Sequence, residues 1–267
     1  MTLAKTAAAV ATCLLAVALN AEDTWTPRPG WAKVFAEAAA TGTVVVVDER
    51  DGQRWVHDAE RARTRFIPAS TFKVPHTLFA LDAGVARDEF QAFAWDRRTR
   101  EVASWNGDQT LRSAMRNSTV WVYQLFARGL GEAREREYLK RVGYGNEDTS
   151  GGLERFWLDG GLRISAVEQV AMLQRLYRNA LPFRVDHQRL VKDLMINEAT
   201  REYILRAKTG WGGGDRPQVG WWVGWVERRE GAVFFALNIA MNADGDAPKR
   251  EAIGRSVLRD IGALPRP

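Results

Sequence analysis

Segments typical of β-strands lie near both ends of this 267-residue chain, and the stretch between them has a helical pattern. Near the start, residues 42–49 (GTVVVVDE) form a continuous run of mainly β-branched apolar side chains, which is typical of a buried strand. Beyond residue 200, three further apolar runs follow one another with only short connections: 203–210, 219–227 and 232–240. Such close spacing predicts an antiparallel meander.

The economical architecture is one sheet built from both ends of the chain, with a helical subdomain inserted between them. Residues 108–196 are mainly helical in pattern, Ser165 and Glu168 have the spacing of a capping box, and residues 249–262 predict a closing helix. The expected fold is of the α/β class, in its α+β type: a mixed antiparallel sheet with flanking helices and an inserted all-helical subdomain. We expect a single domain over residues 22–267, with a sheet subdomain of about 22–66 and 197–267 and a helical subdomain of about 67–196.

The first 21 residues have the three parts of a secretory signal peptide. Lys5 supplies the positive charge, residues 7–19 supply the apolar segment, and Ala16-Val17-Ala18 is a cleavage sequence of the A-x-A type, although a cut after Ala21 also fits. Cleavage would remove Cys13, the only cysteine, and leave a mature domain without disulfides. We expect a periplasmic protein with no membrane contact after cleavage; an uncleaved N-terminal anchor is the alternative.

The composition argues against nucleic-acid binding and against a metal site. The formal charge is +5 and the sequence pI is about 9.5, but arginines are interleaved with acidic residues. Glu132 and Arg136, for example, have the i,i+4 spacing of a solvated helix face. The three histidines, His57, His76 and His187, are widely separated, and the mature chain has no cysteine. We therefore expect no nucleic-acid partner, no metal, and packing or surface roles for the histidines.

A serine and a lysine lie three positions apart in the apolar stretch FIPASTFKVPHTLFALDAG, residues 66–84. The stretch predicts a helix ending at Gly84, with a kink or a 3₁₀ first turn caused by Pro75. On a helix, Ser70 and Lys73 face the same way, so the amine can reach the hydroxyl. Burial lowers the pKa of a lysine, and a neutral amine is the base that a serine nucleophile needs. The backbone N–H of Ser70, near a helix N-terminus, can bind a developing oxyanion.

Three further short motifs follow in order. Ser118-Thr119-Val120 lies at the head of a predicted helix, Tyr144-Gly145-Asn146 opens a long loop over residues 144–163, and Lys208-Thr209-Gly210 ends a strand. A lysine-threonine-glycine motif downstream of a serine-x-x-lysine motif is the joint signature of serine β-lactamases and penicillin-binding proteins. With Trp157-Leu158 in the loop, the whole set resembles the class D serine β-lactamases over about residues 25 to 262. Class A enzymes instead carry Ser-Asp-Asn at the second motif.

The resemblance implies a β-lactam hydrolase of the serine β-lactamase and penicillin-binding-protein fold that acts through an acyl-enzyme on Ser70. In that family, the lysine that matches Lys73 carries a carboxyl group taken from CO₂, and this carbamate is the general base for acylation and deacylation. CO₂ or bicarbonate is then needed, without a bound cofactor. The indole N–H of Trp157 would bond the carbamate, and Val120 and Leu158 would be its apolar neighbours.

The remaining roles also follow from the resemblance. Ser118 would pass a proton toward the nitrogen of the opening ring, and Lys208 would keep the site electropositive. Thr209 and Arg250 would hold the substrate carboxylate, since an arginine can present two parallel N–H donors. Trp211 would supply the second backbone N–H for the oxyanion. The expected catalytic residues are Ser70, Lys73, Ser118, Trp157 and Lys208, and the expected substrate-binding residues are Val120, Leu158, Thr209, Gly210, Trp211 and Arg250.

Three functions stay open at this stage, with the hydrolase as the leading hypothesis. A penicillin-binding protein shares the serine-x-x-lysine and lysine-threonine-glycine motifs but normally lacks the two loop motifs. A β-lactam sensor domain, which stays acylated, follows transmembrane helices in its own chain, whereas this chain has only a signal-like segment. Tyr144 and Asn146 fit a turn as well as a chemical role. The motifs predict a small-molecule β-lactam partner, and they leave the substrate spectrum and the choice between monomer and homodimer undecided.

Overall fold

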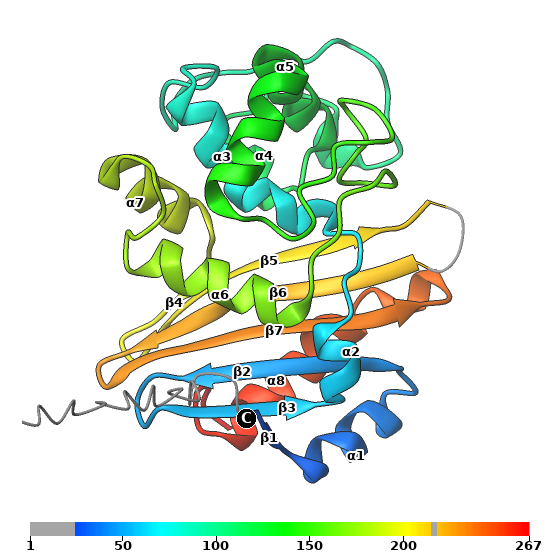
Figure 1. Cartoon of the computed structure of the whole chain (residues 1–267), viewed down its shortest axis with the longest axis vertical. Helices are drawn as coiled ribbons and strands as arrows, with labels where there is room; N and C mark the ends of the chain where they lie inside the picture. The colour runs from blue at the N-terminus through cyan, green and yellow to red at the C-terminus, as the bar shows by residue number, and fades with distance from the viewer. Residues whose placement is uncertain (1–24, 215–217, 267) are drawn as a thin grey trace, which may run out of the picture.

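The computed structural model describes residues 25–214 and 218–266. The predicted signal peptide, residues 1–21 with Cys13, lies outside the described residues. Within the two described ranges, none of the helices combines the length and apolar character that a membrane-spanning helix requires. The elements of Figure 1 run in this order: β1 (Thr26–Pro27), α1 (Pro29–Glu37), β2 (Gly42–Asp48), β3 (Gln53–His57), α2 (Ala59–Arg63), the 3₁₀ helix η2 (Ala69–Phe72), α3 (Lys73–Asp82), the 3₁₀ helix η3 (Ala103–Trp105), α4 (Leu111–Arg116), α5 (Val120–Val142), α6 (Ala166–Tyr177), α7 (Val185–Leu194), β4 (Ile196–Ala199), β5 (Ile204–Gly212), β6 (Gln218–Arg228), β7 (Gly231–Met241), the 3₁₀ helix η4 (Asp244–Asp246) and α8 (Lys249–Asp260).

The strands of the described residues form one seven-stranded sheet in the order β1-β3-β2-β7-β6-β5-β4. All neighbouring pairs are antiparallel except β1 and β3, which are parallel. The two ends of the chain meet where β2 pairs with β7, with Gly42 opposite Ile239 and Asp48 opposite Val233. The predicted mixed antiparallel sheet, built from both ends of the chain, is therefore confirmed, as is the meander β5-β6-β7.

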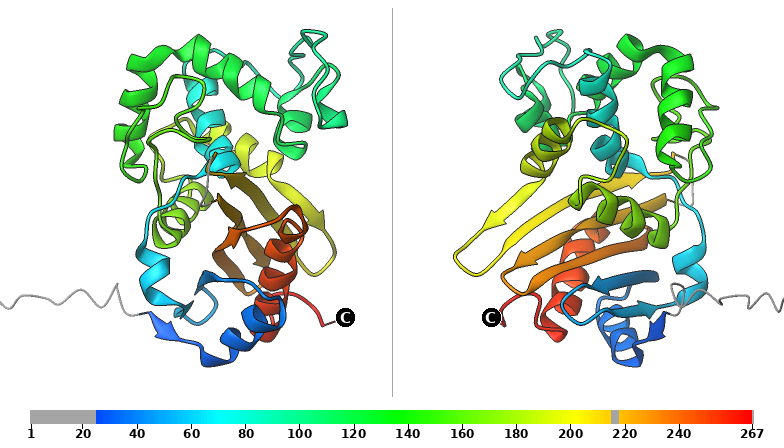
Figure 2. Two further views of the ribbon diagram at one scale, coloured as in Figure 1. Left: turned by 90° about the vertical axis from the view of Figure 1, so that its right-hand side faces the viewer. Right: turned by 60° about the vertical axis from the view of Figure 1, so that its left-hand side comes forward.

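Helices cover both faces of this sheet (Figure 2). All seven residues of β2 are buried. Because successive side chains of a strand point to opposite faces, Val45 and Val47 pack in one core while Val44 and Val46 pack in the other. The first core lies between the sheet and α6 and extends to α3 and α5, and the second lies under α1 and α8. This explains why the N-terminal strand is a continuous apolar run rather than an alternating one.

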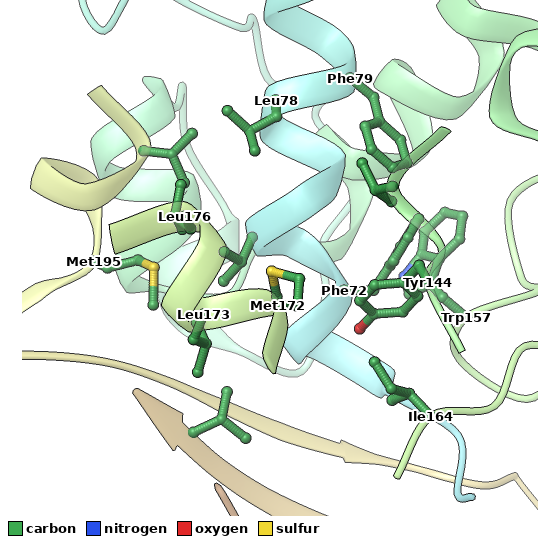
Figure 3. Packing of buried hydrophobic residues seen from close by; sticks show 14 of the residues in the cluster. Phe72, Leu78, Phe79, Tyr144, Trp157, Ile164, Met172, Leu173, Leu176 and Met195 are labelled. Carbon is green, nitrogen blue, oxygen red and sulfur yellow. The ribbon is translucent and has the colours of Figure 1, made fainter. Parts of the chain in front are cut away.

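The segment with Ser70 and Lys73 lies at the centre of the helical part of the molecule. The 3₁₀ turn η2 leads directly into α3, whose third residue is Pro75. The first four N–H groups of a helix have no partner within it, so a proline at this position costs no hydrogen bond. The predicted 3₁₀ first turn is confirmed. Figure 3 shows α3 with Phe72 and Trp157 on one side and α6 on the other.

The long loop at residues 144–163 folds back on itself beside α3. The side chain of Asn146 holds its two ends together, because Nδ2 donates to Gly161 O at 2.9 Å and Oδ1 accepts from Arg163 N–H at 2.7 Å. This closed loop places Trp157 against Phe72, with ring centroids 5.8 Å apart (Figure 3). The loop thus forms one wall of the region around the start of α3.

Candidate active site

Ser70 and Lys73 are direct neighbours in a region that is almost closed to solvent. Lys73 Nζ lies 2.8 Å from Ser70 Oγ. The exposed fraction of Lys73 is 0% and that of Ser70 is 9%, so only the serine is open to the outside. Burial, and after it the positive charge of Lys208, holds the pKa of Lys73 well below its usual value. The pair therefore joins a hydroxyl nucleophile to an amine that can be a base.

Ser118 and Lys208 meet from positions 90 residues apart, with Lys208 Nζ donating a hydrogen bond of 2.9 Å to Ser118 Oγ. Burial, followed by the positive charge of Arg250, lowers the pKa of Lys208 to about 7. Ser118 has a left-handed backbone with a φ of 55°. This conformation costs a non-glycine residue about 1–3 kcal/mol and persists only where the surrounding structure holds it. A hydroxyl held beside an amine with such a pKa can exchange protons with it at neutral pH.

A cleft of about 280 Å³ opens beside Ser70. All six residues predicted to bind substrate are found in its walls, and Lys73 and Trp157 belong to the buried layer outside those walls. The cleft is lined by Ser70, Trp105, Ser118, Val120, Leu158, Thr209, Gly210, Trp211 and Arg250. The structure thus brings predicted residues from five separate parts of the chain to one place.

Arg250 lies against β5 at the edge of the cleft. Its Nη1 donates to Gly210 O at 2.6 Å and its Nε donates to Ala247 O at 2.8 Å. Gly210 in turn approaches the turn that carries Ser70, because a Cβ at this position would lie 3.0 Å from Pro68 O and 3.2 Å from Thr71 Cγ2. The guanidinium and the serine are therefore connected through one tightly packed strand.

Trp157 is fully buried, and its ring packs against the rings of Phe72 and His76 at 5.8 Å and 5.3 Å. Its indole Nε1 has no hydrogen-bond partner among the described residues. Buried indole N–H groups are usually bonded, so this donor is available to a group that joins the site.

Tyr144 and Asn146 lie outside the lining of the cleft. Tyr144 is buried with its ring 5.5 Å from that of Phe72, and burial raises the pKa of its phenol. Asn146 closes the loop that contains Trp157. Of the two interpretations left open by the sequence, the structure favours the structural one for both residues.

Two features near the site were not predicted from the sequence. Trp105 lines the cleft, and its Nε1 donates to Asn117 O at 2.9 Å; a tryptophan beside an Asn-Gly turn is a weak signal for it. His76 and Glu135 form a buried pair with a 2.6 Å contact, which no local pattern indicates because the residues are 59 positions apart. Within the described ranges, no group of three or more His, Cys, Asp and Glu side chains could hold a metal ion.

The fold and the order of these motifs define a class of proteins. The model of the penicillin-binding protein transpeptidase domain matches residues 42–259. The structure is also similar to that of FUS-1 (OXA-85), a class D β-lactamase from Fusobacterium nucleatum subsp. polymorphum. The TM-score is 0.87 at 34% identity, and the match covers 90% of this chain and 100% of the other. The molecule therefore has the fold shared by serine β-lactamases and penicillin-binding proteins.

Two curated relatives narrow this class. Beta-lactamase OXA-2 from Salmonella typhimurium is 58% identical over 254 residues, which are 94% of this chain and 91% of the relative. Beta-lactamase OXA-48 from Klebsiella pneumoniae is 46% identical over 241 residues, which are 90% and 91% of the two chains. The chain belongs to the class D β-lactamases, which are serine hydrolases, and the resemblance drawn from its motifs is confirmed.

Proposed function

We propose that this protein hydrolyses β-lactam antibiotics, penicillins and oxacillin-type compounds among them, through an acyl-enzyme on Ser70. The observation that carries the proposal is the pair of Ser70 and Lys73. A buried amine lies 2.8 Å from a hydroxyl, and that hydroxyl lines a cleft of about 280 Å³. The curated relatives are named beta-lactamases, which supports the substrate class.

In the acylation step, the side chain of Lys73 takes the proton of Ser70, and Ser70 Oγ forms a bond to the carbonyl carbon of the four-membered ring. The ring C–N bond breaks, and Ser118 passes a proton to the leaving nitrogen. Lys208 lies 2.9 Å from Ser118 Oγ and can return a proton to it. A positioned base of this kind typically accelerates the reaction by about 10²–10⁴-fold.

The oxyanion of this step would be bound by the backbone N–H groups of Ser70 and Trp211. The hydrogen-bonding pattern of β5 supports Trp211 N–H as the second donor. The N–H groups of Ala207 and Gly213 bond carbonyls outside the ladder between β5 and β6. Alternate residues of an antiparallel strand point their N–H groups the same way, so Trp211 N–H also points away from β6. Trp211 also lines the cleft, which supports its N–H as the second donor.

The surroundings of Lys73 fit a carboxyl group on its nitrogen. Burial favours the uncharged amine, which is the form that combines with CO₂. The unpartnered N–H of Trp157, in the same buried layer, is a donor that could hold the new carboxylate. When present, the carbamate supplies an anionic general base. Val120 and Leu158, on the cleft side, would keep this region apolar.

Thr209 and Arg250 would hold the carboxylate that β-lactams carry next to the ring. Both residues line the cleft, and the two hydrogen bonds that Arg250 makes to backbone carbonyls orient its guanidinium. An oriented guanidinium loses less side-chain freedom when it binds an anion. This contact would place the ring carbonyl over Ser70.

Between the two steps, the side chain of Lys73 gives up the proton that it took from Ser70, which restores the proton that Lys208 supplied through Ser118. In the deacylation step, a water molecule attacks the ester carbon, the side chain of Lys73 accepts a proton from the water, and the ester C–O bond breaks as Ser70 Oγ receives that proton. The product leaves with the ring opened and a new carboxylate. This step separates a hydrolase from a penicillin-binding protein or a sensor, both of which stay acylated.

We also propose, from the sequence alone, that the signal-like segment directs export and that the mature enzyme acts in the periplasm, where it would confer resistance. The N-terminal pattern of Lys5, the apolar residues 7–19 and the A-x-A sequence supports this location.

Intact-mass measurements with benzylpenicillin and added bicarbonate test the proposed function. We expect many molecules of product per molecule of protein, with the protein returning to its original mass when the substrate is consumed. Ser70→Ala should form neither adduct nor product. A single adduct that persists on Ser70, without further product, would contradict the proposal and support a sensor or a penicillin-binding protein.

A further inference from the structure

A histidine and a glutamate are buried together one helical turn beyond Lys73. His76 Nε2 lies 2.6 Å from Glu135 Oε1, and both side chains have an exposed fraction of 0%. His76 belongs to α3, three residues after Lys73, and Glu135 belongs to α5. Neither residue lines the cleft. The proposed chemistry uses neither of them, so their place so close to Lys73 needs another explanation.

The imidazole of His76 contacts the aromatic rings that surround Lys73. It stacks on Phe72 at 4.9 Å and 28°, meets the edge of Trp157 at 5.3 Å and 61°, and lies 5.8 Å from Tyr123. Phe72 directly precedes Lys73, and the Tyr123 ring lies 5.0 Å from Lys73 Nζ. The imidazole therefore packs against three rings in the buried region around Lys73, and a change in its orientation would disturb all three.

The hydrogen bond to Glu135 fixes that orientation. Hydrogen bonds to an imidazole lie in the plane of its ring, so the bond stops the ring from rotating about its side-chain torsions. An apolar side chain of similar size would fill the same space without this constraint, and buried pairs of this kind add little net stability over such a replacement. A second polar atom of each residue, His76 Nδ1 and Glu135 Oε2, has no partner within the described residues, which adds to the cost of the pair.

The pair also connects α3 to the second half of α5, the part that follows Gly131. The helical geometry of α5 is interrupted at Gly131, which has φ 76° and ψ 160°. Before this break, Tyr123 OH lies 3.0 Å from Thr77 Oγ1 of α3. After the break, Glu135 contacts His76 near the start of α3, and Tyr138 and Arg141 donate to Asp82 at its end, both at 3.0 Å. Both halves of α5 are therefore held against α3, and Glu135 makes the contact that lies beside Lys73.

We propose that His76 and Glu135 are a positioning pair, which holds Phe72, Trp157 and Tyr123 in the arrangement that Lys73 needs to acquire and keep its carboxyl group. The inference rests on the proposed function. Neither residue touches the substrate, and they act on Lys73 only through the rings between them.

Three variants separate positioning from folding. Glu135→Leu removes the hydrogen bond and leaves the imidazole with a buried polar atom unpaired. Glu135→Gln keeps an oxygen that can accept from His76. The double variant His76→Phe with Glu135→Leu removes both polar partners, and such a replacement can be close to neutral for stability. Val44→Ala, in the core on the opposite face of the sheet, is the control for a general loss of stability.

The measurement is the ¹³C signal of the lysine carbamate as a function of ¹³C-bicarbonate concentration, together with the melting temperature. Residues that orient a metal ligand without touching the metal commonly change metal affinity or activity by about 10–100-fold when they are removed, and we use this range for the carbamate. We therefore expect the bicarbonate concentration for half-maximal signal to rise about tenfold in Glu135→Leu and in the double variant, in which the melting temperature recovers. Glu135→Gln and Val44→Ala should stay close to the wild-type bicarbonate requirement.

A wild-type bicarbonate requirement in the double variant would overturn the positioning role. So would a requirement in Glu135→Leu that rises only as far as that of Val44→Ala at an equal loss of melting temperature. Absence of any carbamate signal from the wild-type protein is a different result, since it would refute the proposed base and this inference along with it.

Discussion

The amine of Lys73 lies 2.8 Å from the hydroxyl of Ser70, and the lysine side chain has no exposed surface. The spacing of three residues places both groups on one side of the start of α3, and the packing of the aromatic rings removes water from the amine only. Ser70 keeps access to the cleft. A proton could therefore pass between the two groups away from solvent, while the hydroxyl of Ser70 stays accessible from the cleft.

Replacing Trp157 with phenylalanine tests the role of its unpartnered indole N–H. Trp157→Phe keeps the packing against Phe72 and loses one donor. Hydrogen bonds to charged groups are worth about 1.5–3 kcal/mol, so we expect at least a tenfold increase in the bicarbonate concentration for half-maximal turnover. Trp225→Phe is the control, since its buried indole donates instead to Glu227 at 2.8 Å. Equal bicarbonate requirements in the two variants would contradict the role of Trp157.

The depressed pKa of Lys208, about 7, predicts how stability depends on pH. In the unfolded chain this amine keeps its proton up to about pH 10.5, so between the two values the unfolded state binds more protons. The free energy of unfolding should then rise with pH, by up to about 1.4 kcal/mol per pH unit from this lysine, and this gain is absent below pH 7. Urea unfolding at pH 7, 8 and 9 in CO₂-free buffer would measure it.

Lys208→Met is the control for this dependence of the unfolding free energy on pH. Lys73 has a depressed pKa of the same sign in both proteins, and burial, its largest cause, is unchanged by the substitution. Its contribution therefore largely cancels, and the smaller part that comes from the charge of Lys208 is lost together with that residue. The variant should have a visibly smaller increase in unfolding free energy between pH 7 and 9. Identical slopes would mean that Lys208 is not desolvated as the structure indicates.

Arg250→Lys keeps the positive charge and removes the planar pair of donors. The ammonium group of a lysine cannot make both backbone bonds that Arg250 makes and also present two parallel donors. We expect the KM of a β-lactam to rise about tenfold, with a smaller change in kcat. The same comparison with the ester of that β-lactam should show little difference between wild type and variant. An equal loss for acid and ester would exclude a carboxylate contact.

Gly210→Ala tests the close approach of β5 to the Ser70 turn. The new methyl group would lie 3.0 Å from Pro68 O and 3.2 Å from Thr71 Cγ2, so the strand and the turn must separate. Such overpacking costs about 1–3 kcal/mol, and kcat should fall because the cleft widens at the serine. Gly30→Ala, with no atom within 4 Å of the new Cβ, should leave kcat unchanged. Unchanged kcat in both variants would show that this contact is not needed for the reaction.

Features with a local cause could be predicted from the sequence. The β-branched run at residues 42–49 forms β2, an interior strand of the sheet, and Pro75 lies at the start of α3 after a 3₁₀ turn. The capping box of Ser165 and Glu168 begins α6 as expected, with both side chain-to-backbone bonds present. The short connections between three apolar runs were enough to predict the meander. In each of these cases the residues that decide the structure lie within a few positions of one another.

Some contacts of the site could be predicted from neighbouring residues in the sequence, and others could not. The Ser70–Lys73 contact follows from helical spacing, whereas the prediction that Ser118 and Lys208 share one site came from the resemblance to a family. Trp105 was not predicted, because the adjacent Asn-Gly turn is only a weak signal and does not indicate that η3 borders the cleft. The burial of Lys73 could be expected from its apolar neighbours, but the rings packed in the region around it come from η2, α3, α5 and the loop.

By itself, the sequence determined the elements, the serine-lysine pair and the family, because helical spacing, strand patterning and short motifs act over a few residues. Only the tertiary structure decided that His76 meets Glu135, that Trp157 keeps a free donor beside Phe72, and that Arg250 is held against β5. Those contacts join positions far apart in the chain. They depend on how complete helices and strands pack together, and no pattern of neighbouring residues encodes that packing.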